Sequence, residues 1–180
     1  MHVLVAYASR HGATEGIAAR IADTLRTADL EVDLSDVSAV KDLGRYDAFV
    51  VGSAAYMYHW LKEAQAFVRH NRAVLAKKPT WLFSSGPLGT ETVDAHGVDQ
   101  KVASIPKEMP ELMASTGARE YRVFFGAMER GRKPIGLAER FADMMPVARD
   151  NLPYGDYRDW PEIDAWAVSI AHDLTPVIVA

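Results

Sequence analysis

The chain has 180 residues, of which 49% are hydrophobic and 24% are charged, and 20 Lys and Arg residues against 24 Asp and Glu residues give a net charge of −4. This composition is typical of one globular domain over residues 1–180, which is long enough to bury a core without disulfide or metal support. The absence of cysteine excludes disulfides, thiolate zinc sites, iron–sulfur clusters and cysteine nucleophiles, and the weak negative charge argues against a nucleic-acid-binding surface.

Short apolar runs alternate along the chain with segments whose apolar residues recur every three or four positions. The short runs predict buried strands, and the second pattern predicts amphipathic helices. Asp159, Pro161 and Glu162 have the features of a helix start, with a capping residue and a proline in the first turn. Strands are expected at residues 2–8, 30–36, 46–52, 80–83 and 122–126, and helices at about 14–27, 61–75, before 116, 137–145 and 160–173.

This alternation predicts an α/β fold in which a parallel sheet is covered by helices on both faces. In such a sheet a ligand binds beyond the carboxyl ends of the strands, at a switch in strand order. Three of the expected strand ends are rich in small residues, which let a ligand approach the backbone closely, so we expect one shared crevice. The expected cofactor-binding residues are Ser9, Arg10, His11, Gly12, Ala13, Thr14, Ser53, Ala54, Ala55, Tyr56, Ser84, Ser85, Gly86, Pro87, Leu88 and Gly89.

The first of these loops, residues 9–14, joins a strand to a helix and has the features of a phosphate site. Its N–H groups converge at a helix N-terminus, which attracts anions. Ser9 and Thr14 add hydroxyl donors, and Gly12 permits a positive φ. The loop is neither a Walker A motif nor a Gly-x-Gly-x-x-Gly motif, so a terminal monophosphate fits better than a dinucleotide. The alternative is a plain strand-to-helix turn with a capping hydroxyl.

The second and third loops are expected to flank a flat ring. The segment after Gly52 is crowded with Tyr56, Tyr58 and Trp60, and aromatic side chains stack well on planar heterocycles. The alternative is that Tyr58 and Trp60 start the next helix and pack on the core. The Gly-Pro pair in the third loop is by itself an ordinary turn signal, so only the occurrence of all three loops together predicts a ring-binding site.

The first loop resembles the FMN phosphate motif of the flavodoxin-like family, Ser/Thr-x-Thr-Gly-x-Thr. Ser9, Gly12 and Thr14 match the motif, and His11 stands where the middle Thr is usual. The resemblance implies a doubly wound, five-stranded parallel sheet in the order 2-1-3-4-5 and non-covalently bound FMN. It also implies that the isoalloxazine ring lies between the loop starting at Ser53 and the loop starting at Ser84.

Shorter segments are similar to the branch of this family that contains the menaquinone-dependent protoporphyrinogen oxidases. These segments are residues 7–14, 52–56, 124–127 and 156–160. The similarity implies an FMN-dependent oxidoreductase that passes electrons to a quinone. The alternative is a flavodoxin-type electron carrier that serves protein partners, although such carriers usually surround the flavin with acidic residues. Since the flavin performs the redox chemistry itself, no catalytic residue is predicted from the sequence.

Three further features have both a functional and an ordinary interpretation. His59 is expected near the ring edge, as a proton donor or as an exposed loop histidine. The segment 119–133 has an excess of basic residues and is expected either to receive anionic groups of a substrate, an acidic partner or lipid headgroups, or to be a solvated loop. The apolar stripe at 137–145 either lines a quinone or porphyrin site or a membrane contact, or packs on the sheet.

The cellular location is predicted from the absence of a membrane-spanning run and of a signal peptide. No apolar run approaches the roughly 20 residues that span a bilayer, and the N-terminus lacks the basic region of a signal peptide. We therefore expect a cytoplasmic protein without a transmembrane segment, for which peripheral membrane contact remains open.

Overall fold

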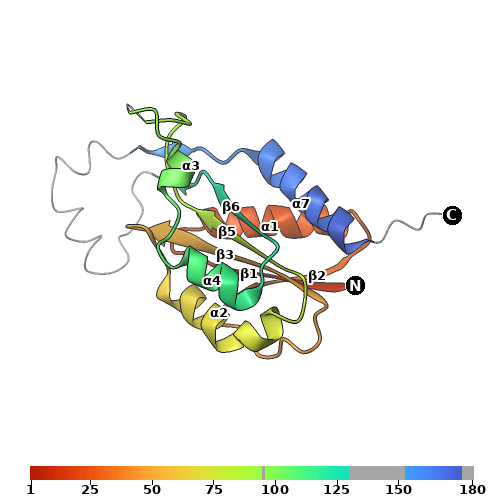
Figure 1. Cartoon of the computed structure of the whole chain (residues 1–180). Coiled ribbons are helices and arrows are strands. Elements are labelled where there is room, and N and C mark those ends of the chain that lie inside the picture. The colour runs from red at the N-terminus through yellow and green to blue at the C-terminus, as the bar shows by residue number, and fades with distance from the viewer. Residues whose placement is uncertain (95, 130–152, 176–180) are drawn as a thin grey trace.

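Five parallel strands form the centre of the computed structural model, which describes residues 1–94, 96–129 and 153–175. They lie side by side in the order β2-β1-β3-β5-β6 (Figure 1). Since β5 and β6 are the fourth and fifth long strands along the chain, the predicted order 2-1-3-4-5 is confirmed. The strands are β1 His2–Ala8, β2 Glu31–Asp36, β3 Ala48–Tyr56, β5 Thr80–Ser85 and β6 Glu120–Phe124.

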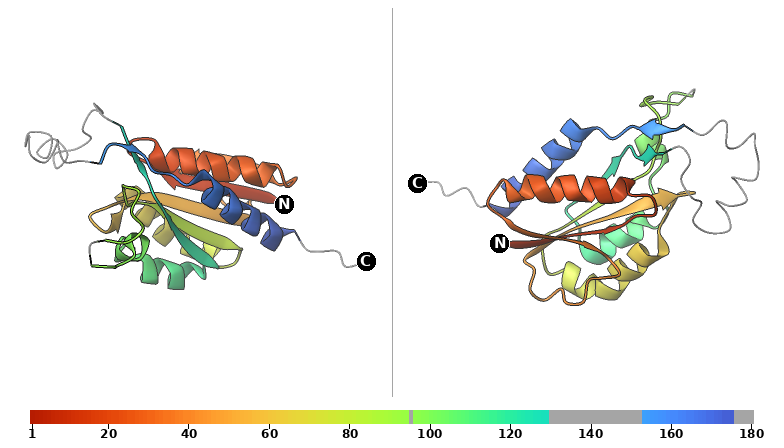
Figure 2. Two further views of the ribbon diagram at one scale, coloured as in Figure 1. Left: turned by 90° about the horizontal axis from the view of Figure 1, so that it is seen from above. Right: turned by 180° about the vertical axis from the view of Figure 1, so that it is seen from behind.

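Helices cover both faces of the sheet, as predicted. The helices α1 (Ala13–Arg26) and α7 (Trp160–Leu174) lie together on one face, and α2 (Lys62–Leu75) and α4 (Met109–Thr116) lie on the other (Figures 1 and 2). The region predicted as one helix before residue 116 contains two, because the short α3 (Gln100–Ala103) precedes α4. None of the helices in the described ranges is both long and apolar enough to cross a membrane.

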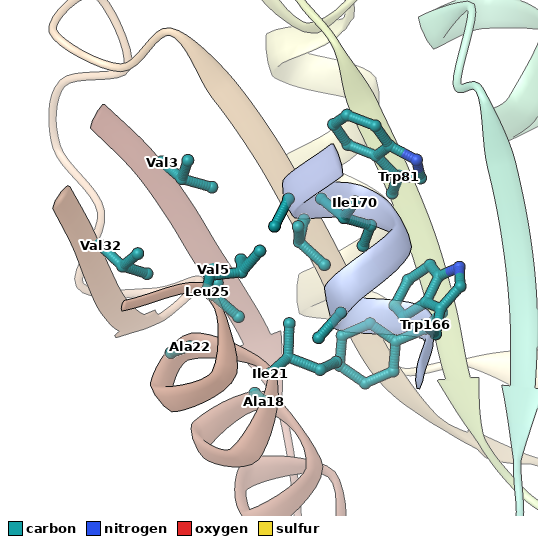
Figure 3. Close-up of a cluster of buried hydrophobic side chains, with 14 of the residues drawn as sticks. Val3, Val5, Ala18, Ile21, Ala22, Leu25, Val32, Trp81, Trp166 and Ile170 are labelled. Atoms are coloured by element: carbon teal, nitrogen blue, oxygen red, sulfur yellow. The ribbon is translucent and has the colours of Figure 1, made fainter. Parts of the chain in front are cut away.

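The core between the sheet and the α1–α7 layer follows from the sequence pattern. Alternate residues of β1, such as Val3 and Val5, point to this face and meet the apolar stripe of α1 (Figure 3). Phe83, Phe124 and Trp166 add an aromatic cluster with ring centroids 5.5–6.1 Å apart. Because complete burial of one large apolar side chain contributes about 1.5–3 kcal/mol, this cluster is a major source of the fold's stability.

The predicted ends of three strands differ from the structure. The third strand does not stop at Gly52 but continues to Tyr56, so residues 53–56 belong to β3 and not to a loop. The extension is stable because the register continues on both sides, with Ala8 opposite Ser53 and Ser85 opposite Ala54. Likewise β5 runs to Ser85 instead of residue 83, and β6 covers 120–124 instead of 122–126.

Three short strands complete the described structure beyond the carboxyl ends of the long strands. The two-residue strand β4 (His59–Trp60) folds back antiparallel on the end of β3, so Trp60 lies in a hairpin and not in the helix that follows. A second pair, β7 (Ala127–Met128) and β8 (Gly155–Asp156), forms a separate antiparallel ribbon. The last helix starts as predicted, with the Asp159 carboxylate accepting the Glu162 N–H (3.0 Å). The helix predicted at 137–145 lies outside the described residues.

Candidate functional site

The carboxyl ends of β1, β3 and β5 meet the start of α1 around a cavity of about 190 Å³. All three predicted strand ends contribute to it, although two of the three lie partly within strands. Most of the predicted cofactor-binding residues line this cavity. They are Ser9, Arg10, His11, Ala13, Thr14, Ala54, Ala55, Tyr56, Ser85, Gly86 and Leu88.

Five of the predicted residues do not line this cavity, namely Gly12, Ser53, Ser84, Pro87 and Gly89. The two serines are fully buried and their hydroxyls bond within the protein. Ser53 Oγ donates to the Ala54 carbonyl (2.9 Å) and accepts the Leu61 N–H (3.1 Å). Ser84 Oγ accepts the Trp60 indole N–H (2.6 Å) and shares a second hydrogen bond of 2.6 Å with the Tyr121 hydroxyl. These serines therefore fix the strand ends and the β3–β4 hairpin.

The structure adds four residues to the cavity wall that the sequence did not single out, namely Met57 and Gly126–Met128. The segment at 126–128 reaches the cavity because it is hydrogen-bonded to the third loop: Gly126 N–H donates to the Pro87 carbonyl (2.9 Å) and Gly86 N–H to the Phe124 carbonyl (3.1 Å). The similarity of residues 124–127 to the oxidase branch was the one available signal, but it did not identify these residues as part of a binding site.

The first loop has the geometry of an anion site. Gly12 adopts a left-handed conformation with φ 83°, and its N–H donates to Ser9 Oγ (3.0 Å). The first hydrogen bond of α1 runs from Gly16 N–H to the Gly12 carbonyl (2.9 Å). The N–H groups of the first three helical residues therefore have no acceptor within the helix, and the positive end of the helix dipole favours a negative charge there.

Two contacts connect the first loop to the other two strand ends. The hydroxyls of Thr14 and Ser85 lie 2.7 Å apart in a buried hydrogen bond. The Arg10 guanidinium lies over the Tyr56 ring, 5.0 Å from its centroid. The three loops that the sequence separates by tens of residues are thus joined directly around the cavity.

The late segment 156–160 supports the start of α1. The Arg158 guanidinium makes two hydrogen bonds to the Asp156 carboxylate (2.7 and 2.6 Å) and stacks over the Trp160 ring at 4.4 Å. A Cβ on Gly16 would overlap the Arg158 side chain, so this guanidinium lies directly on the first turn of the helix. The segment does not line the cavity but braces the element that does.

The β3–β4 hairpin is held by a buried carboxylate. Glu108, whose side chain is 6% exposed, accepts the Trp60 N–H (2.5 Å) and lies 3.0 Å from His59 Nδ1. The His59 side chain is 52% exposed and is absent from the cavity wall. In the same network, burial raises the pKa of the Tyr121 hydroxyl, so Tyr121 stays protonated and can donate to Ser84.

The basic segment predicted at 119–133 is described only in part. Arg119 lies 3.8 Å from Asp173 and Arg122 lies 2.6 Å from Glu120, so both guanidinium groups have carboxylate partners. Arg130, Arg132 and Lys133, together with the apolar stripe at 137–145, lie outside the described residues.

Comparisons with known proteins identify the family and the fold. A family model of the flavodoxin domain matches residues 4–133. No curated protein sequence matches the chain. Among solved structures, a flavodoxin from the domain Archaea is 19% identical with a TM-score of 0.61, covering 97% of this chain and 99% of that one. Flavodoxin 2 of Bacillus cereus is 20% identical with a TM-score of 0.61, covering 96% and 99%.

Part of a longer oxidoreductase chain has the same fold. The rubredoxin oxygen:oxidoreductase of the anaerobe Desulfovibrio gigas is 16% identical with a TM-score of 0.61, and the match covers 99% of this chain but 37% of that one. At these identities the structural matches show the fold alone.

Proposed function

The chain belongs to the flavodoxin domain family, whose members bind FMN, and from this premise we propose that it is an FMN-dependent oxidoreductase. The cofactor would occupy the cavity where the carboxyl ends of β1, β3 and β5 meet the start of α1. The observation that carries the proposal is the meeting of a helix N-terminus and three small-residue strand ends at one cavity. When bound, FMN supplies the electron or hydride transfer, and the protein supplies binding and orientation.

The start of α1 suits the phosphate of FMN. Ser9 accepts the Gly12 N–H, so its own hydroxyl proton remains for a phosphoryl oxygen. The N–H groups of the first helical turn, which have no acceptor within the helix, add donors that require no lysine. His11 stands in place of the usual middle Thr, so one hydroxyl contact of the family motif is replaced by a residue that offers its backbone N–H.

The remaining cavity wall suits a flat ring. Ala54, Ala55 and Gly86 carry little or no side chain, which lets a planar group approach the backbone. Tyr56 and Leu88 add larger side chains to the same lining. We propose that these residues orient the isoalloxazine and keep water from its faces.

For the reaction partner we propose a quinone, in a role similar to that of the protoporphyrinogen oxidases. The sequence segments 124–127 and 156–160 support this assignment. A further support is the charge of the cavity: its described lining includes Arg10 and His11 but no Asp or Glu. A carrier that docks protein partners through an acidic rim is the alternative, and it fits this lining less well. The cytoplasmic location and the single domain over residues 1–180 remain predictions from the sequence.

The first experiment is an absorbance spectrum of the purified protein before and after addition of FMN. We expect bound-flavin bands and a saturable titration, whereas a colourless protein that does not bind FMN in a calorimeter would contradict the proposal. The second experiment compares two electron-transfer assays on the FMN-loaded protein. Oxidation of protoporphyrinogen with menaquinone supports the oxidase role, and rapid reduction by a flavodoxin reductase without oxidase activity supports the carrier.

A further inference from the structure

The buried hydrogen bond between Thr14 and Ser85 joins the phosphate loop to the opposite strand end. Thr14 is the second residue of α1 and is 0% exposed, and Ser85 is the last residue of β5 and is 5% exposed. Their hydroxyl oxygens lie 2.7 Å apart although the residues are 71 positions apart in the chain. Both residues also line the cavity.

The chemistry of two paired hydroxyls restricts what this pair can do. Each hydroxyl has one proton, so a bond between them uses one proton and leaves the other for a third group. A phosphoryl oxygen can only accept. The pair can therefore offer one donor, and Thr14, which lies at the helix N-terminus where an anion is favoured, would be the residue that faces a phosphoryl group. This requires Ser85 to donate to Thr14, and Thr14 to donate onward.

We propose that Ser85 is a positioning residue for the FMN phosphate, acting through Thr14. The inference rests on the proposed function and adds a residue from the third strand end to the phosphate site. Without the Ser85 hydroxyl, the Thr14 side chain can rotate away or turn its proton to the backbone, so a donor that was oriented beforehand must be ordered on binding. Charge-assisted bonds of this kind are stronger than neutral ones, so the loss is measurable.

The test compares FMN with riboflavin, which lacks the phosphate. Dissociation constants are measured by flavin fluorescence for the wild type, Ser85→Ala, Thr14→Val and the double variant. We expect Thr14→Val to raise the Kd for FMN about tenfold and Ser85→Ala about threefold to tenfold, while the Kd for riboflavin changes less than about twofold. The Kd of the double variant for FMN should lie within about twofold of the Kd of Thr14→Val, because both substitutions remove the same donor.

Ser84→Ala is the matched control, since Ser84 is the adjacent buried serine and its hydroxyl bonds to Trp60 and Tyr121. It should lower the melting temperature but leave the ratio of the two dissociation constants unchanged. Ser85→Thr, which keeps the hydroxyl, should retain the preference for FMN. If Ser85→Ala does not fold, Ser85→Cys, whose somewhat larger thiol is a weaker donor, should show the same selective loss.

The inference would be overturned if Ser85→Ala weakened the binding of FMN and of riboflavin equally, or if the effects of the two substitutions were additive in the double variant. Ser85 would then have a packing role only. These outcomes are separate from failure of the proposed function, because in that case the wild-type protein itself does not bind FMN.

Discussion

Gly52 of β3 lies opposite Phe83 of β5, and a Cβ on Gly52 would overlap the Phe83 ring. The ring occupies the space above the glycine and packs against Phe124 and Trp166, with centroids 6.1 Å away in both cases. The glycine that looks like a strand end in the sequence is therefore a packing position within the strand.

Gly52→Ala is expected to destabilise the fold by about 1–3 kcal/mol or more, because the new methyl group forces the Phe83 ring out of a close-packed cluster. Phe83→Leu is also destabilising by itself, since it leaves a void. The double variant should cost less than the sum of the two, because leucine vacates part of the space that the methyl group needs. Urea unfolding of the four proteins measures this coupling, and strict additivity would contradict the packing argument.

Gly12→Val is expected to weaken FMN binding at least about tenfold and to destabilise the fold, since a left-handed backbone costs a non-glycine residue about 1–2 kcal/mol. No heavy atom lies within 4 Å of a Cβ built at Gly12, so the cost is conformational and not steric. Gly12→Asn is the control, because asparagine tolerates this conformation better. A fluorescence titration in which Asn and Val weaken FMN equally would instead indicate a clash with the ligand.

Gly16→Ala tests the contact between α1 and Arg158. In a helix interior, replacing glycine by alanine stabilises the fold by about 1 kcal/mol through helix propensity. In this protein, however, the new methyl group meets the Arg158 guanidinium. We expect the gain to be lost or reversed in the wild-type background and to reappear after Arg158→Ala. Thermal unfolding in both backgrounds provides the measurement, and the same gain in each would show that Arg158 does not rest on the helix.

Asp156 should make the fold sensitive to acid. Hydrogen bonding to the Arg158 side chain lowers the pKa of Asp156 below its ordinary value, so its carboxylate stabilises the folded state wherever the unfolded chain is already ionised, above about pH 4. The stabilisation is lost as the pH falls through the folded pKa. Asp156→Asn should therefore lower stability at neutral pH by about 1 kcal/mol or less, given that the pair is partly exposed.

The difference in melting temperature between the wild type and Asp156→Asn should stay constant from about pH 6 to 8 and shrink below about pH 4. Other carboxylates also titrate in acid, but they are common to both proteins and cancel in the difference. A difference that grows toward low pH would have the wrong sign for this interaction.

Hydrophobic periodicity predicted the order and type of the main elements, because the residues that face the core recur every two positions in a strand and every three or four in a helix. It was wrong about strand ends, as at Gly52, since a strand continues where neighbours supply hydrogen bonds and a glycine gives no sign of the ring above it. The three small-residue strand ends predicted one shared crevice, and the cavity at that place is lined by most of the predicted residues. Which of those residues bind FMN remains a prediction.

The local sequence pattern could not predict the hydrogen-bond partners of the side chains. Ser84 and Ser85 are neighbours of the same type, yet one hydroxyl bonds to Trp60 and Tyr121 and the other to Thr14. Alternation along β5 sends the two to opposite faces, but their partners come from elements far away in the chain. The contribution of residues 126–128 to the cavity arises in the same way, through bonds to the third loop.

The sequence alone determined the alternation of strands and helices, the parallel sheet and the strand-to-helix loop that resembles an FMN site, because these depend on local spacing and residue type. Only the tertiary structure decided which hydroxyls face the cavity, which are bonded within the core, and how Arg158 supports the first turn of α1. Those choices depend on groups tens of residues apart being brought within hydrogen-bond distance, which no local pattern encodes.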